Sequence, residues 1–208
     1  MFKLLRYFSI TSLVAFAIVA LVLGQFYRQT ALNDLVSIGE SRNVALTQAF
    51  ANSLWPQFTA FADSVAGLSG DEIRARPETA QLYQAVAALM SGVDVVKVKV
   101  YNLEGLTIFS TQLSQIGEDK SSNAGYLAAR SGQVASELTH RNTFSAFEST
   151  VEDVDVLSSY IPLQRGGPAA SIEGVFEIYT DVTPLLRRID QTQRNVTLFV
   201  VAALSLLY

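Results

Sequence analysis

The sequence predicts an α+β domain flanked by two transmembrane helices. Each end of the chain carries a strongly apolar stretch without a charged residue, residues 7–27 near the start and residues 195–208 at the end. Between them, helical periodicity fills the first part and two-residue alternation fills most of the rest. Helices and strands in separate parts of a chain are typical of an α+β domain, and about 165 residues is an ordinary single-domain size. We expect a long N-terminal helix packed on an antiparallel sheet of about five strands.

The first uncharged run is long enough to cross a bilayer as a helix. Tyr7, Phe26 and Tyr27 lie at its ends, where amphipathic aromatic side chains prefer the membrane interfaces. A signal peptide is the alternative, but residues 23–27 offer no small-x-small cleavage site. We therefore predict an uncleaved transmembrane helix at residues 7–27, which follows a cytoplasmic N-terminus at residues 1–6.

The second uncharged run, residues 195–208, is too short to span a bilayer by itself. We interpret it as the truncated start of a second transmembrane helix, because a C-terminal core helix would show a polar face. Lys3 and Arg6 precede the first run and place the N-terminus in the cytoplasm. Residues 28–194 are thus predicted to lie in the periplasm, in a protein of the bacterial inner membrane.

The region after the first run is predicted to be helical. Apolar residues recur at spacings of three and four from residue 30 to about residue 68. Trp55 and Pro56 interrupt this helix, and proline lacks the amide hydrogen that the helix needs, so a kink is expected there. We interpret Trp55 as a core aromatic residue. A second helix is expected over residues 78–90.

The next region alternates between apolar and polar residues. Residues 93–101 place valines on one face of a strand and Lys97 and Lys99 on the other. We interpret this strand as the first half of an antiparallel hairpin, with residues 106–111 returning and the lysines facing solvent. The remaining predicted elements are strands at 134–140, 153–163 and 172–181, a short helix near 125–130, and an amphipathic helix at 184–193.

Composition and motifs exclude several functional classes. The chain has no cysteine, so disulfides, thiolate metal sites and cysteine nucleophiles are absent. Its net charge of −4 does not indicate a nucleic-acid-binding surface. The chain contains no P-loop, HExxH or GxSxG motif. We expect no catalytic residue, metal or cofactor, and hence no enzyme. The acidic cluster of Glu148, Glu152, Asp153 and Asp155 is interpreted as a solvated strand edge rather than a cation site.

Three stretches carry a resemblance to a known family: YNLEGLTIFST, IGEDKSSNAGYLAA and SSYIPLQRGGPAASIEGVFEIYTDVTPLL. In this order, over residues 93–186, they resemble the extracytoplasmic Cache domains, also called PAS-like sensor domains. The resemblance implies the input half of a membrane receptor, with a sensor histidine kinase as first choice and a diguanylate cyclase or chemoreceptor as alternatives. A domain that binds no ligand and only dimerises, or contacts a partner, is the other functional class.

The resemblance also implies a ligand pocket between the sheet and the loop that carries the short helix. The family pattern transfers to four residues of this sequence: Tyr126, Arg130, Tyr160 and Asp181. His140 and Arg141 end the preceding predicted strand and are therefore expected at the rim of the pocket. Arginine and histidine together suit a carboxylate or another anion, so a small anionic ligand is expected. The other expected partners are the lipid bilayer and a second copy of the chain, in a homodimer.

The predicted topology can be tested with reporter fusions in the domain. Fusions at Gly70 and Gly166 should both report a periplasmic location, because both positions lie between the two uncharged runs. A cytoplasmic signal from either fusion would contradict the topology.

Overall fold

The computed structural model describes residues 2–147, 149–165 and 170–207. Residues 36–182 form one compact unit, which contains the whole sheet. Residues 2–35 and 183–207 form a second, helical unit.

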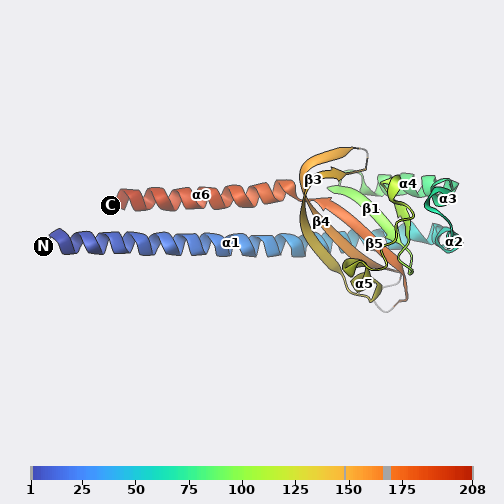
Figure 1. The fold of residues 1–208 in the computed structure, drawn as a ribbon, viewed down its shortest axis with the longest axis horizontal. Helices are drawn as coiled ribbons and strands as arrows, with labels where there is room; N and C mark the ends of the chain where they lie inside the picture. Colours follow the sequence, from blue (N-terminus) through green and yellow to red (C-terminus); the bar gives the residue numbers. More distant parts are fainter. Residues whose placement is uncertain (1, 148, 166–169, 208) are drawn as a thin grey trace. The chain divides into compact units, whose positions relative to one another are not determined.

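The sheet has five strands, and every neighbouring pair is antiparallel (Figure 1). Its strand order is β2-β1-β5-β4-β3, so the last strand of the chain lies at the centre, between β1 and β4. The strands are β1 (Val95–Tyr101), β2 (Thr107–Ser110), β3 (Ala135–Ser145), β4 (Thr150–Gln164) and β5 (Ile172–Asp181). The predicted α+β fold with an antiparallel five-stranded sheet is confirmed. The predicted β4–β5 loop, residues 164–170, lies largely outside the described residues.

The α-helices are α1 (Phe2–Ser53), α2 (Thr59–Ser64), α3 (Gly70–Arg74), α4 (Pro77–Met90), α5 (Ala124–Arg130) and α6 (Thr183–Leu207). Two short 3₁₀ turns, η1 (Trp55–Gln57) and η2 (Leu113–Gln115), complete the set. The long N-terminal helix is confirmed. Its expected continuation to residue 68 as a kinked helix is wrong, because α1 ends at Ser53, just before Pro56, and a separate short helix follows. The sequence analysis missed α3, which a capping box of Ser69 and Glu72 begins.

The main core lies on one face of the sheet. Phe50 of α1 and Phe176 of β5 are fully buried, and their ring centroids are 4.7 Å apart. Trp55 belongs to the same cluster, as expected, and its indole Nε1 donates a hydrogen bond of 2.9 Å to Glu173. Apolar residues of α2, α3 and α4 complete this cluster.

The opposite face of the sheet is covered as well, which corrects the sequence analysis. Lys97 and Lys99 were expected to face solvent, but they are only 5% and 3% exposed. Residues 111–134, which follow β2 and include α5, fold back over this face (Figure 1). Alternation identifies the two faces of a strand, but it cannot tell which face a later segment will cover.

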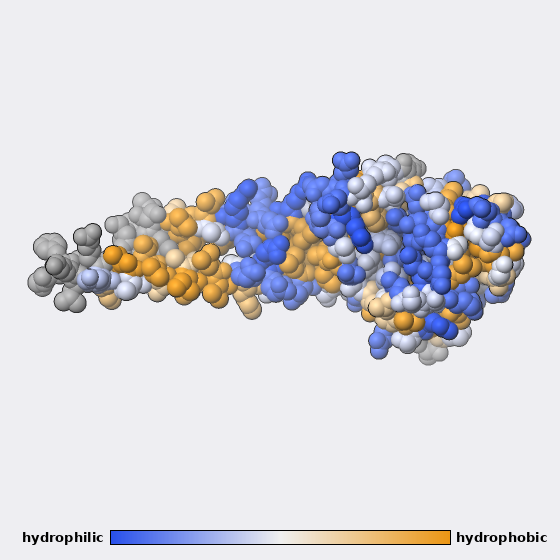
Figure 2. All heavy atoms as spheres, viewed as in Figure 1, coloured by the Kyte–Doolittle hydropathy of each residue, from blue (hydrophilic) through white to orange (hydrophobic). Residues whose placement is uncertain are grey.

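The helical unit contains one candidate membrane span. Within α1, the segment Ile10–Ser53 contains a stretch long and apolar enough to cross a bilayer. Its apolar side chains are exposed, as Phe16, Leu21 and Phe26 illustrate, and Figure 2 shows them gathered along this part of the helix. In its described part, α6 does not reach the same combination of length and apolar composition. The second transmembrane helix therefore stays a prediction.

Replacing Phe50 by alanine should lower the free energy of unfolding by about 3–5 kcal/mol, because a buried aromatic side chain would leave a cavity. Ile38→Ala is the control on the same helix, since Ile38 is 70% exposed, and its effect should stay within about 0.5 kcal/mol. Denaturant unfolding of the full chain in detergent measures both. Equal effects of the two variants would contradict the core described here.

Candidate ligand-binding site

A cavity of about 360 Å³ opens on the covered face of the sheet, between the start of α5 and strands β3, β4 and β5. It lies between the sheet and the loop with the short helix, where the sequence analysis expected a pocket. Its lining residues are Asn123, Ala124, Gly125, Ala135, Ser136, Glu137, Arg141, Ser158, Tyr160, Glu177 and Tyr179. Gly125 approaches the Tyr160 ring so closely that any larger residue would collide with it.

Strand register brings the polar side chains of this face together. Glu177 of β5 lies opposite Lys99 of β1 and opposite Tyr160 of β4. Tyr179, two residues further along β5, projects from the same face. Directly opposed side chains on one face are close enough to interact. The centre of the sheet therefore carries a carboxylate among tyrosines and lysines.

Glu177 is the most deeply buried carboxylate of this face, with 1% of its surface exposed. The hydroxyl of Tyr101 donates a hydrogen bond to its Oε2 atom. Its Oε1 atom has no hydrogen-bond partner among the residues that the structure describes. Burial, and then the charge of Glu177, raise the pKa of the Tyr101, Tyr160 and Tyr179 phenols. These phenols therefore remain protonated at neutral pH.

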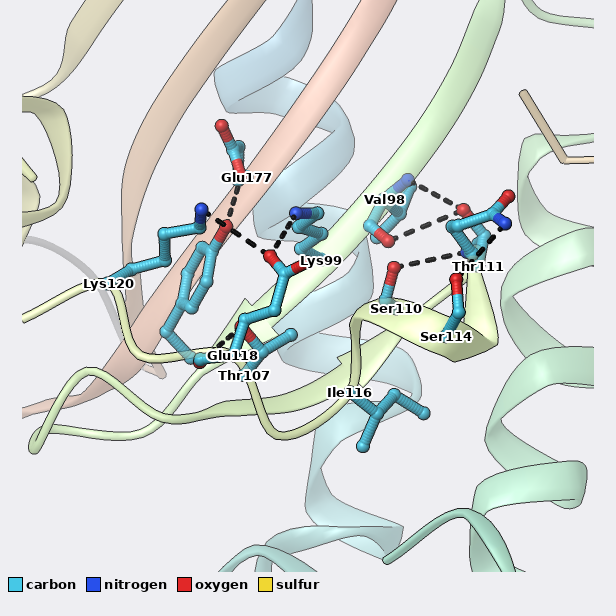
Figure 3. A network of polar contacts seen from close by, with 12 residues as sticks. Val98, Lys99, Thr107, Ser110, Thr111, Ser114, Ile116, Glu118, Lys120 and Glu177 are labelled. Atoms are coloured by element: carbon cyan, nitrogen blue, oxygen red, sulfur yellow. Dashed lines mark hydrogen bonds and ion pairs between the residues drawn. The ribbon is translucent and has the colours of Figure 1, made fainter. Parts of the chain in front are cut away.

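The two buried lysines have different surroundings. Lys99 Nζ lies 3.5 Å from Glu118, which is also 3.4 Å from Lys120, and Figure 3 shows the two lysines reaching the same carboxylate. Lys97 Nζ instead lies 4.0 Å from the centroid of the Phe144 ring. Desolvation and the nearby charge of Lys99 lower the pKa of Lys97 to about 8.

Of the six predicted site residues, the structure places two in the lining of the cavity, Arg141 and Tyr160. Tyr126 is a fully buried residue of α5, and its hydroxyl donates a hydrogen bond of 3.0 Å to the carbonyl of Asn102. Arg130 is exposed in the last turn of α5 and does not line the cavity.

The other two residues lie away from the cavity lining. His140 projects from the opposite face to Arg141, and its Nδ1 lies 2.9 Å from Asp155. This hydrogen bond raises the pKa of the imidazole. Asp181 is the last residue of β5. Of the acidic cluster, Glu148 lies outside the described residues, and the described part of the chain holds no metal-binding group of three His, Asp or Glu side chains.

Sequence reasoning missed Glu177 and Tyr179, which line the cavity. The signal was present, because Glu177 lies between apolar residues in a strand that was correctly predicted. A charged residue inside such a strand is rarely buried without a specific role. The strand's central place in the sheet, which buries this position, was not predictable from alternation.

A buried polar network connects the cavity to α1. The Ser136 hydroxyl, in the cavity lining, donates a hydrogen bond of 2.8 Å to Ser159 of β4. Ser159 accepts one of 3.0 Å from the side-chain amide of Asn43, which is fully buried in α1. The Asn43 side-chain oxygen in turn accepts a hydrogen bond of 2.9 Å from Thr180 of β5. One helix residue is thus bonded to both strands that form the floor of the cavity.

No family model matches the chain, and no curated protein matches it. Among solved structures, the E. coli DcuS sensor domain is 15% identical with a TM-score of 0.45, over 82% of this chain and 98% of that one. The sensor domain of the V. cholerae histidine kinase DctB is 14% identical with a TM-score of 0.43, over 78% and 57%. The periplasmic domain of RsbU from Chlamydia trachomatis is 12% identical with a TM-score of 0.35, over 79% and 58%.

These similar structures are sensor or periplasmic domains of bacterial proteins. The chain spans a little over half the length of the second and third of them. At such identities and TM-scores, a functional assignment has to come from the cavity and contacts of this chain.

The lowered pKa of Lys97 predicts a pH-dependent stability. Between about pH 8 and its ordinary value of 10.5, the unfolded chain binds this proton more strongly, so the free energy of unfolding should rise with pH. Lys97→Met should lessen the rise, and Lys97→Arg should too, because arginine stays protonated throughout. The part that remains belongs to Lys99, whose pKa is also lowered by burial. Denaturant unfolding at pH values from about 7.5 to 9.5, below tyrosine ionisation, measures it. Equal slopes in wild type and both variants would contradict the assignment.

Proposed function

We propose that this chain is the input part of a bacterial transmembrane receptor, and that it binds a small molecule in the cavity between α5 and strands β3, β4 and β5. The main support is the buried, incompletely hydrogen-bonded Glu177 in the lining of a cavity of about 360 Å³. A concave site of this size with a few convergent polar groups is typical of small-molecule binding. A domain that only dimerises would not need this arrangement, since a buried unsatisfied carboxylate lowers stability.

The proposed domain organisation follows the sequence analysis. Residues 7–27 span the inner membrane, residues 28–194 form the periplasmic sensor domain, and residues 195–208 begin a second span. The receptor is expected to act as a homodimer, with its output in a separate cytoplasmic module. A histidine kinase is the first expectation for that module, and a diguanylate cyclase or chemoreceptor is the alternative. The role of this chain is then reception rather than catalysis.

The signal is proposed to leave the cavity through the polar network around Asn43. A ligand that contacts β4 and β5 can favour one position of these strands against α1, because Asn43 bonds to Ser159 and Thr180. Small shifts of packed elements are a recognised way of switching. The ligand shifts this equilibrium only by its difference in affinity for the two states.

Ligand-dependent stabilisation of the full chain in detergent tests the function. A panel of amino acids, amines, carboxylates, sugars and alcohols is screened by thermal unfolding. A compound present at about 100 times its Kd adds about 2.7 kcal/mol to the free energy of unfolding and raises the transition temperature. Failure of every class of compound would contradict ligand sensing and favour the dimerisation module.

Asn43→Ala should separate binding from signalling. Ser159 and Thr180 would lose a buried partner, so the free energy of unfolding should fall by about 1–3 kcal/mol. Ligand affinity should change less than about threefold, which corresponds to under 1 kcal/mol, while ligand-dependent output of the full-length receptor should be largely lost. The matched control is Asn52→Ala, an exposed asparagine on the same helix. Undiminished output in the Asn43 variant would exclude this route.

A further inference from the structure

The side chain of Glu177 lines a cavity, and its Oε1 atom is a buried hydrogen-bond acceptor without a donor among the described residues. The side chain is 1% exposed, it lines the cavity, and its other oxygen is already bonded to Tyr101. We propose that the ligand binds through a protonated primary amine, which donates a hydrogen bond to Glu177 Oε1. This inference rests on the proposed function and specifies the chemistry of the same site.

Among the described residues no donor meets Oε1 in hydrogen-bond geometry, although the Tyr160 and Tyr179 phenols lie close enough to Glu177 for hydrogen bonding to contribute to their raised pKa. Lys99, directly opposite Glu177 in the sheet, reaches Glu118 instead. Lys97 lies over the Phe144 ring, and the described residues form no ion pair with Glu177. A buried carboxylate oxygen without a hydrogen bond costs more free energy than a neutral group in the same place. A donor from the ligand removes this cost, and it does so only in the bound state.

The surroundings of Glu177 favour an ammonium group over a neutral donor. Tyr160 is its direct cross-strand neighbour, and Tyr179 is two residues further along β5, so two aromatic rings that line the cavity flank the carboxylate. Aromatic rings combined with a carboxylate are a typical environment for a bound ammonium group. Burial of both groups strengthens the pairing, because a charge-assisted hydrogen bond is about twice as strong as a neutral one.

The charges of the cavity wall agree with this assignment. Two carboxylates line it, Glu137 and Glu177, against one cation, Arg141. Lys99 does not line the cavity, and its charge is compensated by an ion pair with Glu118. An anionic ligand, which the sequence analysis expected, would have Arg141 as its only cationic contact in the lining. An amine finds its partner in the buried centre of the cavity, and a carboxylate on the same ligand could still reach the exposed Arg141.

Isothermal titration of the full chain in detergent, at pH 7, tests the inference with probes that share one carbon skeleton. n-Butylamine, 1,4-diaminobutane and 4-aminobutanoate carry an amine, whereas n-butanol and butanoate do not. We expect binding by amine probes only. Glu177→Gln keeps the shape and the acceptor for Tyr101, and it should weaken amine binding at least about tenfold. Glu152→Gln, the matched control at an exposed carboxylate of β4 that does not line the cavity, should change it less than about threefold.

The comparison of probes on the wild-type chain decides the question even if the Glu177 variant fails to fold. Binding by butanol or butanoate as tight as by butylamine would overturn the inference, and so would unchanged amine affinity in a folded Glu177→Gln variant. If a compound without an amine binds while every amine fails, the inference is wrong and the proposed sensor function stands. If neither these probes nor the wider panel bind, both are wrong.

Discussion

The central position of β5 is the constraint on which the rest of this structure depends. The strand arrives last in the chain, yet it pairs with β1 on one side and β4 on the other. Its alternating side chains therefore enter two different environments. Phe176 and Ile178 complete the apolar core against α1, while Glu177 and Tyr179 point into the covered face that contains the cavity. One strand thus couples the stability of the domain to the chemistry of its site.

The covered face combines charges that would be unfavourable if left alone. Lys97, Lys99 and Glu177 are each more than nine-tenths buried. Residues 111–134 make this possible, because they bring Glu118 to Lys99 and close α5 over the tyrosines. The buried charge is incompletely compensated at two residues. Glu177 Oε1 has no hydrogen-bond partner among the described residues, and the pKa of Lys97 is lowered. Incomplete compensation of this kind is characteristic of functional sites, where stability is given up for binding.

The polar network around Asn43 has the same character. An asparagine in the buried face of a helix is less stabilising than a well-packed apolar residue unless all its hydrogen bonds are made. Here they bond α1 to β4 and β5 at a defined position. A purely apolar contact would allow the helix to slide against the sheet, whereas directional bonds define discrete positions. Such bonds therefore specify the position of α1 relative to β4 and β5, the strands that line the cavity.

The sequence alone determined the elements that depend on local chemistry. Alternation located the five strands, and β5 was predicted with its observed bounds. The uncharged run marked the exposed apolar part of α1. Pro56 was correctly identified as an interruption, but the helix ends before it rather than continuing with a kink. The motifs placed Tyr160, and the end of a predicted strand placed Arg141, near a pocket between the sheet and the short helix, and the cavity lies there.

Only the tertiary structure decided which face of each strand was buried and which residues met. His140 and Arg141 are adjacent in sequence, yet one pairs with Asp155 and the other lines the cavity. Lys97 and Lys99 had the pattern of a solvated face and became buried when a later segment covered them. Strand order and coverage depend on contacts between residues far apart in the chain, and the free energy of those contacts leaves no local pattern in the sequence.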